Sequence, residues 1–437
     1  MRRRARAAWA AILLAASAGG AAAQSGRALY QGHAPFAAGR EATANRLPPA
    51  HAACANCHGA DAAGRREGGV VAPPLGWAAL TRPGQGAGAY AEAAALRAAV
   101  THGIGRDGRS LDPAMPRYRL EAGEWAALLD YLRIAGTPAD RPPGVAADHV
   151  ALGTVLPLSG RAAATGAAVL AGLEAGLAEA RVHGRRLVLQ AVDGASLGTV
   201  PAVRRLLARP VFALLGGIWP EDAAAEALLA EARVAHIGSL LTRAREDATG
   251  AWAVDLLAPL SAQQATLAAA LRHCPAEPRL GLLVAPVEAG GPGTTWLADP
   301  AGLMQAVGAA GPAGCLGTSL AGAARIDGRR LPAGWRWQVV LPFPAALLEG
   351  EGAARPDPWR RLGFAAARLA VETLAQAGLV LTERAPLAAL PAHLEPWPGA
   401  ALHFGPRRRQ GWDPGLIELS APAPATDAVA PPTPEGG

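Results

Sequence analysis

The sequence of 437 residues contains no lysine, so all 41 of its basic side chains are arginines. A Walker A phosphate loop needs a lysine ammonium and a Schiff-base enzyme needs a lysine amine, so both classes are excluded. Aromatic residues make up only 5% of the chain and charged residues 17%, whereas hydrophobic residues reach 51%. This composition excludes general disorder, and the length predicts more than one domain.

Long hydrophobic runs are missing as well, except near the start of the sequence. Four arginines within Met1–Arg6 precede an apolar run from Ala7 to Ala18, and three alanines end at Ala23. This pattern predicts a secretory signal peptide over residues 1–23, with an uncleaved anchor as the alternative. At about 1.5 Å per residue the run is shorter than the ~30 Å core of a bilayer. We therefore expect a periplasmic protein without a stable membrane span.

Negative charge is nearly as abundant as positive charge once the predicted signal peptide is set aside. The whole chain has a formal net charge of +6, which by itself suggests a nucleic-acid partner. Removal of residues 1–23 takes away four arginines and no acidic residue, which leaves 37 basic against 35 acidic side chains. We therefore expect no nucleic-acid partner.

Cysteine is rare, with four in the chain, and two of the four form one motif. Cys54-Ala55-Asn56-Cys57-His58 is the C-x-x-C-H pattern of covalent haem attachment. Its two thiols can reach the two vinyl groups of one porphyrin, and the adjacent imidazole can then bind the iron. A redox C-x-x-C, a structural disulfide and a zinc half-site are the alternatives, although zinc would need two more ligands nearby. The motif predicts one covalent haem c, with His58 as an iron ligand.

Methionine is rarer still, and only Met115 and Met304 follow the predicted signal peptide. Met115 lies between Pro113 and Pro116, which stiffen its loop. We predict Met115 as the second axial ligand, against the alternatives of simple core packing and of His102, His51 or His33 as the ligand. A thioether on the iron suits outer-sphere electron transfer rather than substrate chemistry.

Helical patterns surround these residues. Apolar side chains at helical spacing predict helices over residues 90–100 and 121–134. The glycines of 103–108 match a dinucleotide-binding motif by letter, but they follow a helix rather than a strand, so this interpretation fails. With the C-x-x-C-H motif, Pro73-Pro74-Leu75 and Met115-Pro116, residues 24–136 resemble a class I monohaem cytochrome c, and we assign this domain to residues 24–138. The resemblance implies an all-α domain in which a carbonyl at Pro73 or Pro74 orients the axial histidine.

A second, larger unit follows a proline-rich linker at residues 139–148. Short apolar runs alternate there with helical patterns, which predicts a mostly parallel sheet covered by helices. Residues 421–437 are rich in proline, alanine and threonine and predict a disordered tail. The predicted strands are 150–156, 187–192, 211–218, 235–239, 280–285 and 337–341, and the predicted helices are 162–181, 200–208, 221–233, 261–273 and 358–377.

Two stretches of this unit carry a family likeness. Residues 153–160, followed by Gly166, and residues 402–411 resemble segments of type I periplasmic solute-binding proteins of the branched-chain amino-acid class. The resemblance covers residues 149–419 of a domain that we assign to residues 149–420, and it implies two α/β lobes that close on a ligand. The expected fold class is therefore multidomain: an all-α cytochrome c domain followed by a two-lobed α/β domain with parallel sheets.

The expected ligand contacts depart from that family. Its members carry serine and threonine after the third strand, where this chain has residues 218–222 with an indole and two carboxylates. An anionic ligand group would be repelled there. Helix capping is the alternative role for the hydroxyl side chains. The candidate ligand contacts are Ser159, Thr165, Trp219, Ser239 and Thr242.

The remaining cysteines are Cys274 and Cys315. Cys274 follows a predicted helix and Cys315 begins a later strand, and these ends meet at one edge of a parallel sheet. In an exported protein we predict a disulfide between them, with two buried thiols as the alternative.

The motifs together favour a periplasmic electron carrier that is not an enzyme. Its redox partner would be a dehydrogenase or an oxidase, and the solute-binding-like domain would dock that partner or sense a small molecule. The alternative is the receptor of an ABC-type uptake system for amino acids or small solutes, with the haem as a redox sensor. A haem peroxidase is a weaker possibility, because it requires that Met115 does not bind the iron. Common hydrolase motifs are absent.

Overall fold

The computed structural model describes residues 26–34, 36, 53–67, 69–82, 89–90, 92–137, 139–245, 249–282, 294–297, 299–349, 357–377, 381 and 385–420. The predicted signal peptide and the predicted disordered tail lie outside these residues. The chain divides into two compact units, Met1–Pro142 and Pro143–Gly437, called here the N-terminal and C-terminal units. The division falls inside the linker predicted at residues 139–148. Among the described residues, no helix is long and apolar enough to cross a membrane.

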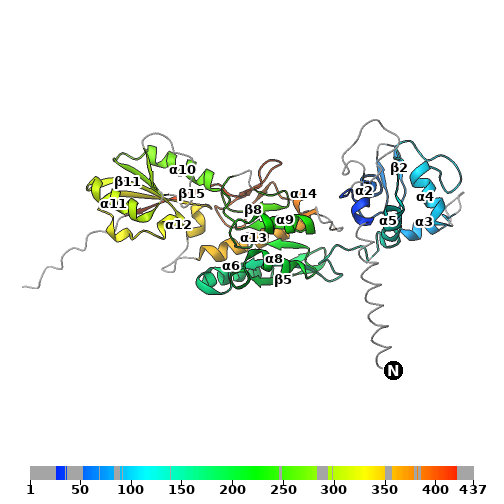
Figure 1. Ribbon diagram of the computed structural model, residues 1–437, viewed down its shortest axis with the longest axis horizontal. Helices are drawn as coiled ribbons and strands as arrows, with labels where there is room; N and C mark the ends of the chain where they lie inside the picture. Colours follow the sequence, from blue (N-terminus) through cyan, green and yellow to red (C-terminus); the bar gives the residue numbers. More distant parts are fainter. Residues whose placement is uncertain are drawn as a thin grey trace, which may run out of the picture. The chain divides into compact units, whose positions relative to one another are not determined.

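The N-terminal unit is mainly helical (Figure 1). Its helices α4 and α5 correspond to the two predicted from sequence, and a capping box between Glu121 and Glu124 begins α5. A short antiparallel hairpin was not predicted. The elements are α2 (Cys54–His58), β1 (Arg65–Glu67), β2 (Val70–Ala72), α3 (Trp77–Thr81), α4 (Ala93–His102) and α5 (Ala122–Ile134).

Two buried tyrosines tie the start of this unit to its end. The rings of Tyr30 and Tyr131 lie 5.1 Å apart, and both side chains are fully buried. The Tyr30 hydroxyl donates to the Gly59 carbonyl at 2.8 Å, next to α2, and the Tyr131 hydroxyl donates to Asp140 at 3.0 Å. Burial raises the pKa of both phenols, so both remain protonated donors. The core therefore fixes α2 against α5.

The first sheet of the C-terminal unit has six strands in the order β4-β5-β3-β6-β7-β8. All neighbouring pairs are parallel except β4–β5. Right-handed crossovers require helices between parallel strands, as the alternating sequence pattern predicts. The strands are β3 (His149–Leu156), β4 (Arg181–Val182), β5 (Arg185–Asp193), β6 (Ala213–Leu215), β7 (Ala235–Ser239) and β8 (Ala253–Asp255).

The second sheet has five strands in the order β10-β9-β11-β12-β15, and only β15 is antiparallel to its neighbour. Helix α10 packs on β11 and β12, and α11 packs on β9. The elements are α10 (Leu260–Arg272), β9 (Arg279–Leu282), β10 (Thr295–Leu297), α11 (Pro300–Ala310), β11 (Ala313–Ser319), α12 (Leu320–Ala323), β12 (Gly334–Leu341) and β15 (Gly415–Ser420).

The chain returns from the second sheet to the first through a long helix. Helix α13 packs against α6 and against β7 of the first sheet, and Figure 1 shows the two helices together. A small sheet follows before β15 rejoins the second sheet. The remaining elements are α6 (Ala163–Leu177), α7 (Gly194–Leu197), α8 (Thr199–Leu207), α9 (Ala223–Ala232), α13 (Pro358–Gln376), α14 (Ala385–Ala388), β13 (His393–Leu394) and β14 (Leu402–His403).

The predicted fold class is confirmed: a cytochrome-like helical unit precedes an α/β unit with two mostly parallel sheets. Differences concern individual elements. The strand predicted at 211–218 forms only at Ala213–Leu215, because the chain turns through Gly216 and Gly217 with positive φ angles of 61° and 91°. Strands β8, β10 and β15 and helix α11 were not predicted, and β11 was predicted only as a strand that begins at Cys315.

Candidate haem site and solute-binding edge

A cavity of about 640 Å³ lies in the N-terminal unit beside α2. Cys54, Cys57, His58 and Met115 all line it, together with mainly apolar side chains. Its volume falls within the usual range of about 300–1,000 Å³ for cofactor pockets. The C-x-x-C-H motif and Met115, which lie in two separate parts of the sequence, therefore meet at one mainly apolar cavity.

The imidazole of His58 is held in one tautomer. Its Nδ1 lies 2.7 Å from the carbonyl oxygen of Pro73, and a carbonyl oxygen can only accept a hydrogen bond. The proton must therefore lie on Nδ1, which leaves the Nε2 lone pair for a metal. Burial, the largest effect, lowers the pKa of His58, whereas the bond to Pro73 raises it. This is the histidine–proline contact that the sequence resemblance implies.

Local hydrogen bonds stabilise the loop that carries Met115. The Met115 amide donates to the Asp112 carbonyl at 3.0 Å, and the Arg117 guanidinium donates to the carbonyls of Met115 and Leu111. Gly103, with φ of +69°, makes room for Arg117: a Cβ at this position would lie 2.0 Å from the guanidinium Nε. The loop is thus held by main-chain contacts, and the Met115 side chain lines the cavity.

The competing axial ligands lie elsewhere or outside the described residues. His102 is exposed at the end of α4 and does not line the cavity, and neither does His33. His51 lies outside the described residues. Met115 is therefore the candidate ligand that the structure brings to the cavity of His58.

Exposed apolar side chains of the hairpin lie at the same cavity. Val70 and Val71 of β2 are 42% and 56% exposed and also line the cavity. Arg106 lines it as well, with its guanidinium 5.0 Å from the centre of the Tyr90 ring. The sequence pattern did not predict the hairpin, because three-residue strands carry too little alternation to be recognised.

The donor set at this cavity fits a covalently attached haem. Two cysteines can form thioether links, and a neutral imidazole and a thioether sulfur are common axial ligands of haem iron. Cys54 and Cys57 take no part in a disulfide in the structure. The apolar walls suit a porphyrin face.

In the C-terminal unit, the candidate solute contacts gather at the carboxyl edge of the first sheet. Ser159 follows β3, and its hydroxyl binds Asp193 at the end of the neighbouring β5. This bond is the largest of the effects that lower the pKa of Asp193 to about 2. Thr165 is half-buried near the start of α6. Parallel pairing of β3 and β5 therefore brings Ser159 close to Asp193, whereas Thr165 belongs to α6.

Trp219 and Ser239 occur at the same edge but are buried. The Trp219 ring is 8% exposed and stacks on His236, with the ring centres 4.8 Å apart. The Ser239 hydroxyl accepts the Leu241 amide at 3.2 Å, and its side chain is fully buried. Thr242 is exposed. Of the five candidates, two are thus committed to internal packing.

His236 is a fully buried imidazole at the centre of this packing. Its Nε2 donates to the Gly216 carbonyl, because the carbonyl can only accept. Burial, the dominant effect, lowers the pKa of His236 to about 4. His236 is therefore neutral near pH 7.

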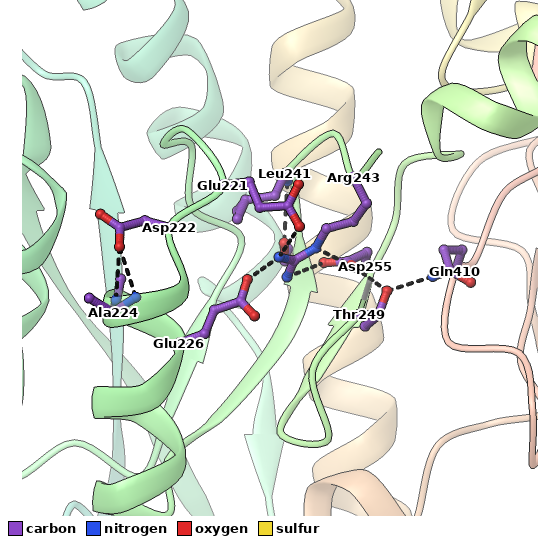
Figure 2. A network of polar contacts seen from close by, with 11 residues as sticks. Glu221, Asp222, Ala224, Glu226, Leu241, Arg243, Thr249, Asp255 and Gln410 are labelled. Carbon is purple, nitrogen blue, oxygen red and sulfur yellow. Dashed lines mark hydrogen bonds and ion pairs between the residues drawn. The ribbon is translucent and has the colours of Figure 1, made fainter. Parts of the chain in front are cut away.

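A buried arginine extends the edge toward the C-terminal segment (Figure 2). Arg243 is fully buried, and its guanidinium pairs with Asp255 at 3.1 Å, with Glu226, and with Glu221 at 3.7 Å. Asp255 also accepts from Thr249 at 2.7 Å, and Thr249 accepts from Gln410 at 2.5 Å. Sequence reasoning missed this cluster, because its members are spread over nearly two hundred positions and match no motif.

The charges of this cluster stabilise one another. Burial is the largest effect and lowers the pKa of Arg243, but Asp255 and Glu226 together raise it above its usual value. Removal of Arg243 would leave Asp255 buried without its cation, which typically costs about 3–5 kcal/mol. The carboxylates of Glu221 and Glu226 are therefore engaged by the chain's own cation.

The two remaining cysteines lie at the second sheet. The structure joins Cys274 and Cys315 in a disulfide, with their Cα atoms 6.4 Å apart. Cys274 follows α10, and Cys315 lies in β11, where both are buried against Leu267 and Leu271. The bond thus links a helix end to the neighbouring strand.

Comparisons with known proteins give one family match. Residues 37–135 match the family model of cytochrome c. A search of curated proteins found no match.

Solved structures resemble most of the remaining chain. A periplasmic substrate-binding protein from Ralstonia solanacearum is 19% identical and covers 61% of this chain and 96% of its own, with a TM-score of 0.45. A possible leucine/isoleucine/valine-binding protein from Rhodopirellula baltica is 15% identical, with coverage of 65% and 96% and a TM-score of 0.47. An amino acid ABC transporter substrate-binding protein from Pseudomonas fluorescens is 12% identical, with coverage of 64% and 92% and a TM-score of 0.48.

Proposed function

We propose that this protein is a periplasmic electron carrier with one covalent haem c, bound by His58 and Met115. The observation that carries the proposal is the cavity lined by Cys54, Cys57, His58 and Met115 within the segment that matches the cytochrome c family. When bound, the haem supplies a one-electron iron couple. If His58 and Met115 both held the iron, no position would be open for a substrate, so we expect a carrier and not a peroxidase.

The chain's own residues tune that centre. Pro73 keeps the proton of His58 on Nδ1, and Arg117 holds the Met115 loop through two carbonyls. The cavity walls are mainly apolar and would surround the haem with a medium of low polarity. Val70 and Val71 are exposed at the same cavity and provide an apolar contact for a redox partner, which would be a dehydrogenase or an oxidase.

The C-terminal unit serves partner docking in this proposal. Trp219 and Ser239 are buried in internal contacts. At the same edge of the first sheet, Arg243 forms ion pairs with the carboxylates of Glu226 and Asp255. Because these side chains are engaged in contacts within the chain, they support a stabilising role of this sheet edge rather than the binding and release of a solute. The alternative is a solute receptor of an ABC-type uptake system with a haem sensor, and the two mostly parallel sheets favour it.

The axial ligand is tested by a matched pair of methionine variants. Met115→Ala should lower the reduction potential and allow added imidazole to bind the ferric haem at least about tenfold more tightly, or about 1.4 kcal/mol. Met304→Ala removes the half-buried methionine of α11 and should leave both properties unchanged. An unchanged spectrum and potential in Met115→Ala would show that Met115 is not the ligand.

Solute binding separates the two roles of the C-terminal unit. The full chain is titrated with amino acids and small alcohols in a calorimeter, in both oxidation states of the haem. We expect no saturable heat. Tight binding of one solute would overturn the docking role and favour the receptor, whereas the assignment of the haem ligands would stand.

A further inference from the structure

Two histidines face each other across the small sheet of the C-terminal unit. His393 of β13 pairs with His403 of β14, and the next pair along is Leu394 with Leu402. Side chains alternate between the two faces of a strand. Leu402 is fully buried and both histidines are exposed. The leucine pair therefore anchors the hairpin to the core and presents the histidine pair to solvent.

The two rings are already close enough to share one metal ion. Their Nδ1 atoms lie 3.4 Å apart, and the ring centres are 4.9 Å apart. Zinc–imidazole bonds measure about 2.0–2.1 Å, so two nitrogens at tetrahedral angles lie about 3.3 Å apart. Square-planar geometry would bring them to about 2.9 Å. The observed separation matches a tetrahedral ion.

We propose that His393 and His403 form a surface site for Zn²⁺ with two protein ligands. Both imidazoles bind through Nδ1, so each ring carries its proton on Nε2. Among the described residues, no group of three or more His, Cys, Asp or Glu side chains is placed to hold a metal. Water or a donor from another molecule fills the remaining two tetrahedral positions.

The surroundings support a fixed geometry. The His403 amide donates to the Gly411 carbonyl at 3.0 Å, which ties β14 to the neighbouring segment. Glu395, two residues after His393, accepts the Gly399 amide at 2.8 Å and places a negative charge at the hairpin turn. The nearby Arg408 is engaged by Asp413 at 3.0 Å. The histidines therefore need little rearrangement to bind a cation, which lowers the entropic cost.

Calorimetric titration of the tag-free full chain with Zn²⁺ tests the site. We expect His393→Gln and His403→Gln each to weaken one binding event by at least about tenfold, since each removes one of two ligands. The matched control is His273→Gln, which changes another exposed histidine of the same unit and should leave that event unchanged.

A second measurement separates metal binding from a folding defect. Zn²⁺ should raise the midpoint of thermal unfolding in the unaltered protein and not in the His393→Gln and His403→Gln variants, whereas all midpoints should agree with EDTA present. Equal Zn²⁺ affinity in all proteins would overturn the site. Loss of binding in His273→Gln alone would assign the metal elsewhere.

Discussion

Two histidines in this protein each donate a hydrogen bond to a different backbone carbonyl. The bond fixes the tautomer of each imidazole, with different consequences. Pro73 accepts from Nδ1 of His58, and Gly216 accepts from Nε2 of His236. His58 lines a cavity and keeps its other nitrogen available there. His236 is fully buried under Trp219, so its remaining nitrogen serves no cavity and the residue acts as a neutral packing element. The same hydrogen bond thus supports a ligand in one unit and a core in the other.

His236 should make the C-terminal unit sensitive to acid. Its pKa is about 4 when folded and about 6.5 when unfolded, so the unfolded chain binds more protons between these values. The contribution of His236 to stability is therefore complete above about pH 6.5 and falls as the pH drops toward 4. We expect a loss of about 2 kcal/mol between pH 7 and pH 5, measured by urea unfolding.

The His236→Gln variant provides the comparison, because the glutamine amide nitrogen falls near the position of Nε2, can still donate to Gly216 and does not titrate. This variant should be less stable at pH 7 and should lose about 2 kcal/mol less than the unaltered protein on going to pH 5. Identical pH profiles for the two proteins would contradict the assignment.

Residues of a local motif were predictable from the sequence, whereas most contacts between distant residues were not. The Cys274–Cys315 pair is an exception, because the ends of a helix and a strand indicated it. Cys54, Cys57 and His58 follow from five adjacent letters. Arg243 has its partners at positions 221, 226 and 255, and nothing in the sequence marks them as neighbours. The burial of Trp219 was missed for the same reason: only the folded chain shows that it stacks on His236.

At the scale of elements, helix packing depends on glycine. A Cβ at Gly363 of α13 would lie 2.2 Å from the Val169 carbonyl oxygen of α6, and a Cβ at Gly172 of α6 would lie 2.0 Å from the Arg360 carbonyl oxygen of α13. The two helices therefore approach so closely that their backbones touch. Because α13 also packs on β7, this contact fixes the returning helix on the first sheet.

Gly363→Ala should destabilise the protein although alanine favours helices. The propensity gain is about 1 kcal/mol, but separating two packed backbones costs more, so we expect a net loss of about 2 kcal/mol in urea unfolding. The control is Gly308→Ala in α11, where a Cβ meets nothing within 4 Å. That variant should be unchanged or up to about 1 kcal/mol more stable. Equal effects of the two substitutions would refute the close-packing argument.

Elements with strong periodicity were predicted well, and short or small-residue elements were not. Helices α5 and α13 agree with their predictions to within one residue at each end. Strand β11 reads Ala-Gly-Cys-Leu-Gly-Thr-Ser, in which Thr318 is the only β-branched residue and none is aromatic, so the sequence indicated only a strand that begins at Cys315. Its burial comes from packing against α10. Whether such a segment forms a strand therefore depends on its tertiary contacts.

At the scale of the whole molecule, one chain carries two separately packed units. The two units have their own hydrophobic cores, one beside α2 and α5 and the others under the two sheets. The sequence predicted this division from the proline-rich stretch and from the change in pattern beyond it. The boundary between Pro142 and Pro143 was not resolved from sequence, because Asp140 belongs to the first core through Tyr131, and Gly144 packs on Phe212 of the second.

The disulfide should therefore stabilise one unit only. Cys274 and Cys315 are separated by 41 positions, and closing a loop of this length stabilises by about 4 kcal/mol through the unfolded state. In protein whose haem iron is already reduced in every sample, we expect a thiol reductant to lower the unfolding midpoint of the C-terminal unit, monitored by tryptophan fluorescence. The unfolding transition of the N-terminal unit, monitored by haem absorbance, should be unchanged.

The double variant Cys274→Ala/Cys315→Ala isolates the effect of the bond from other actions of the reductant. Its C-terminal transition should lie near that of the reduced protein and should not move when reductant is added. A reductant-induced shift in the haem transition would mean that the two units unfold together, because separate units share no free energy of unfolding. A C-terminal transition that ignores reductant in the unaltered protein would mean that the two thiols are not bonded.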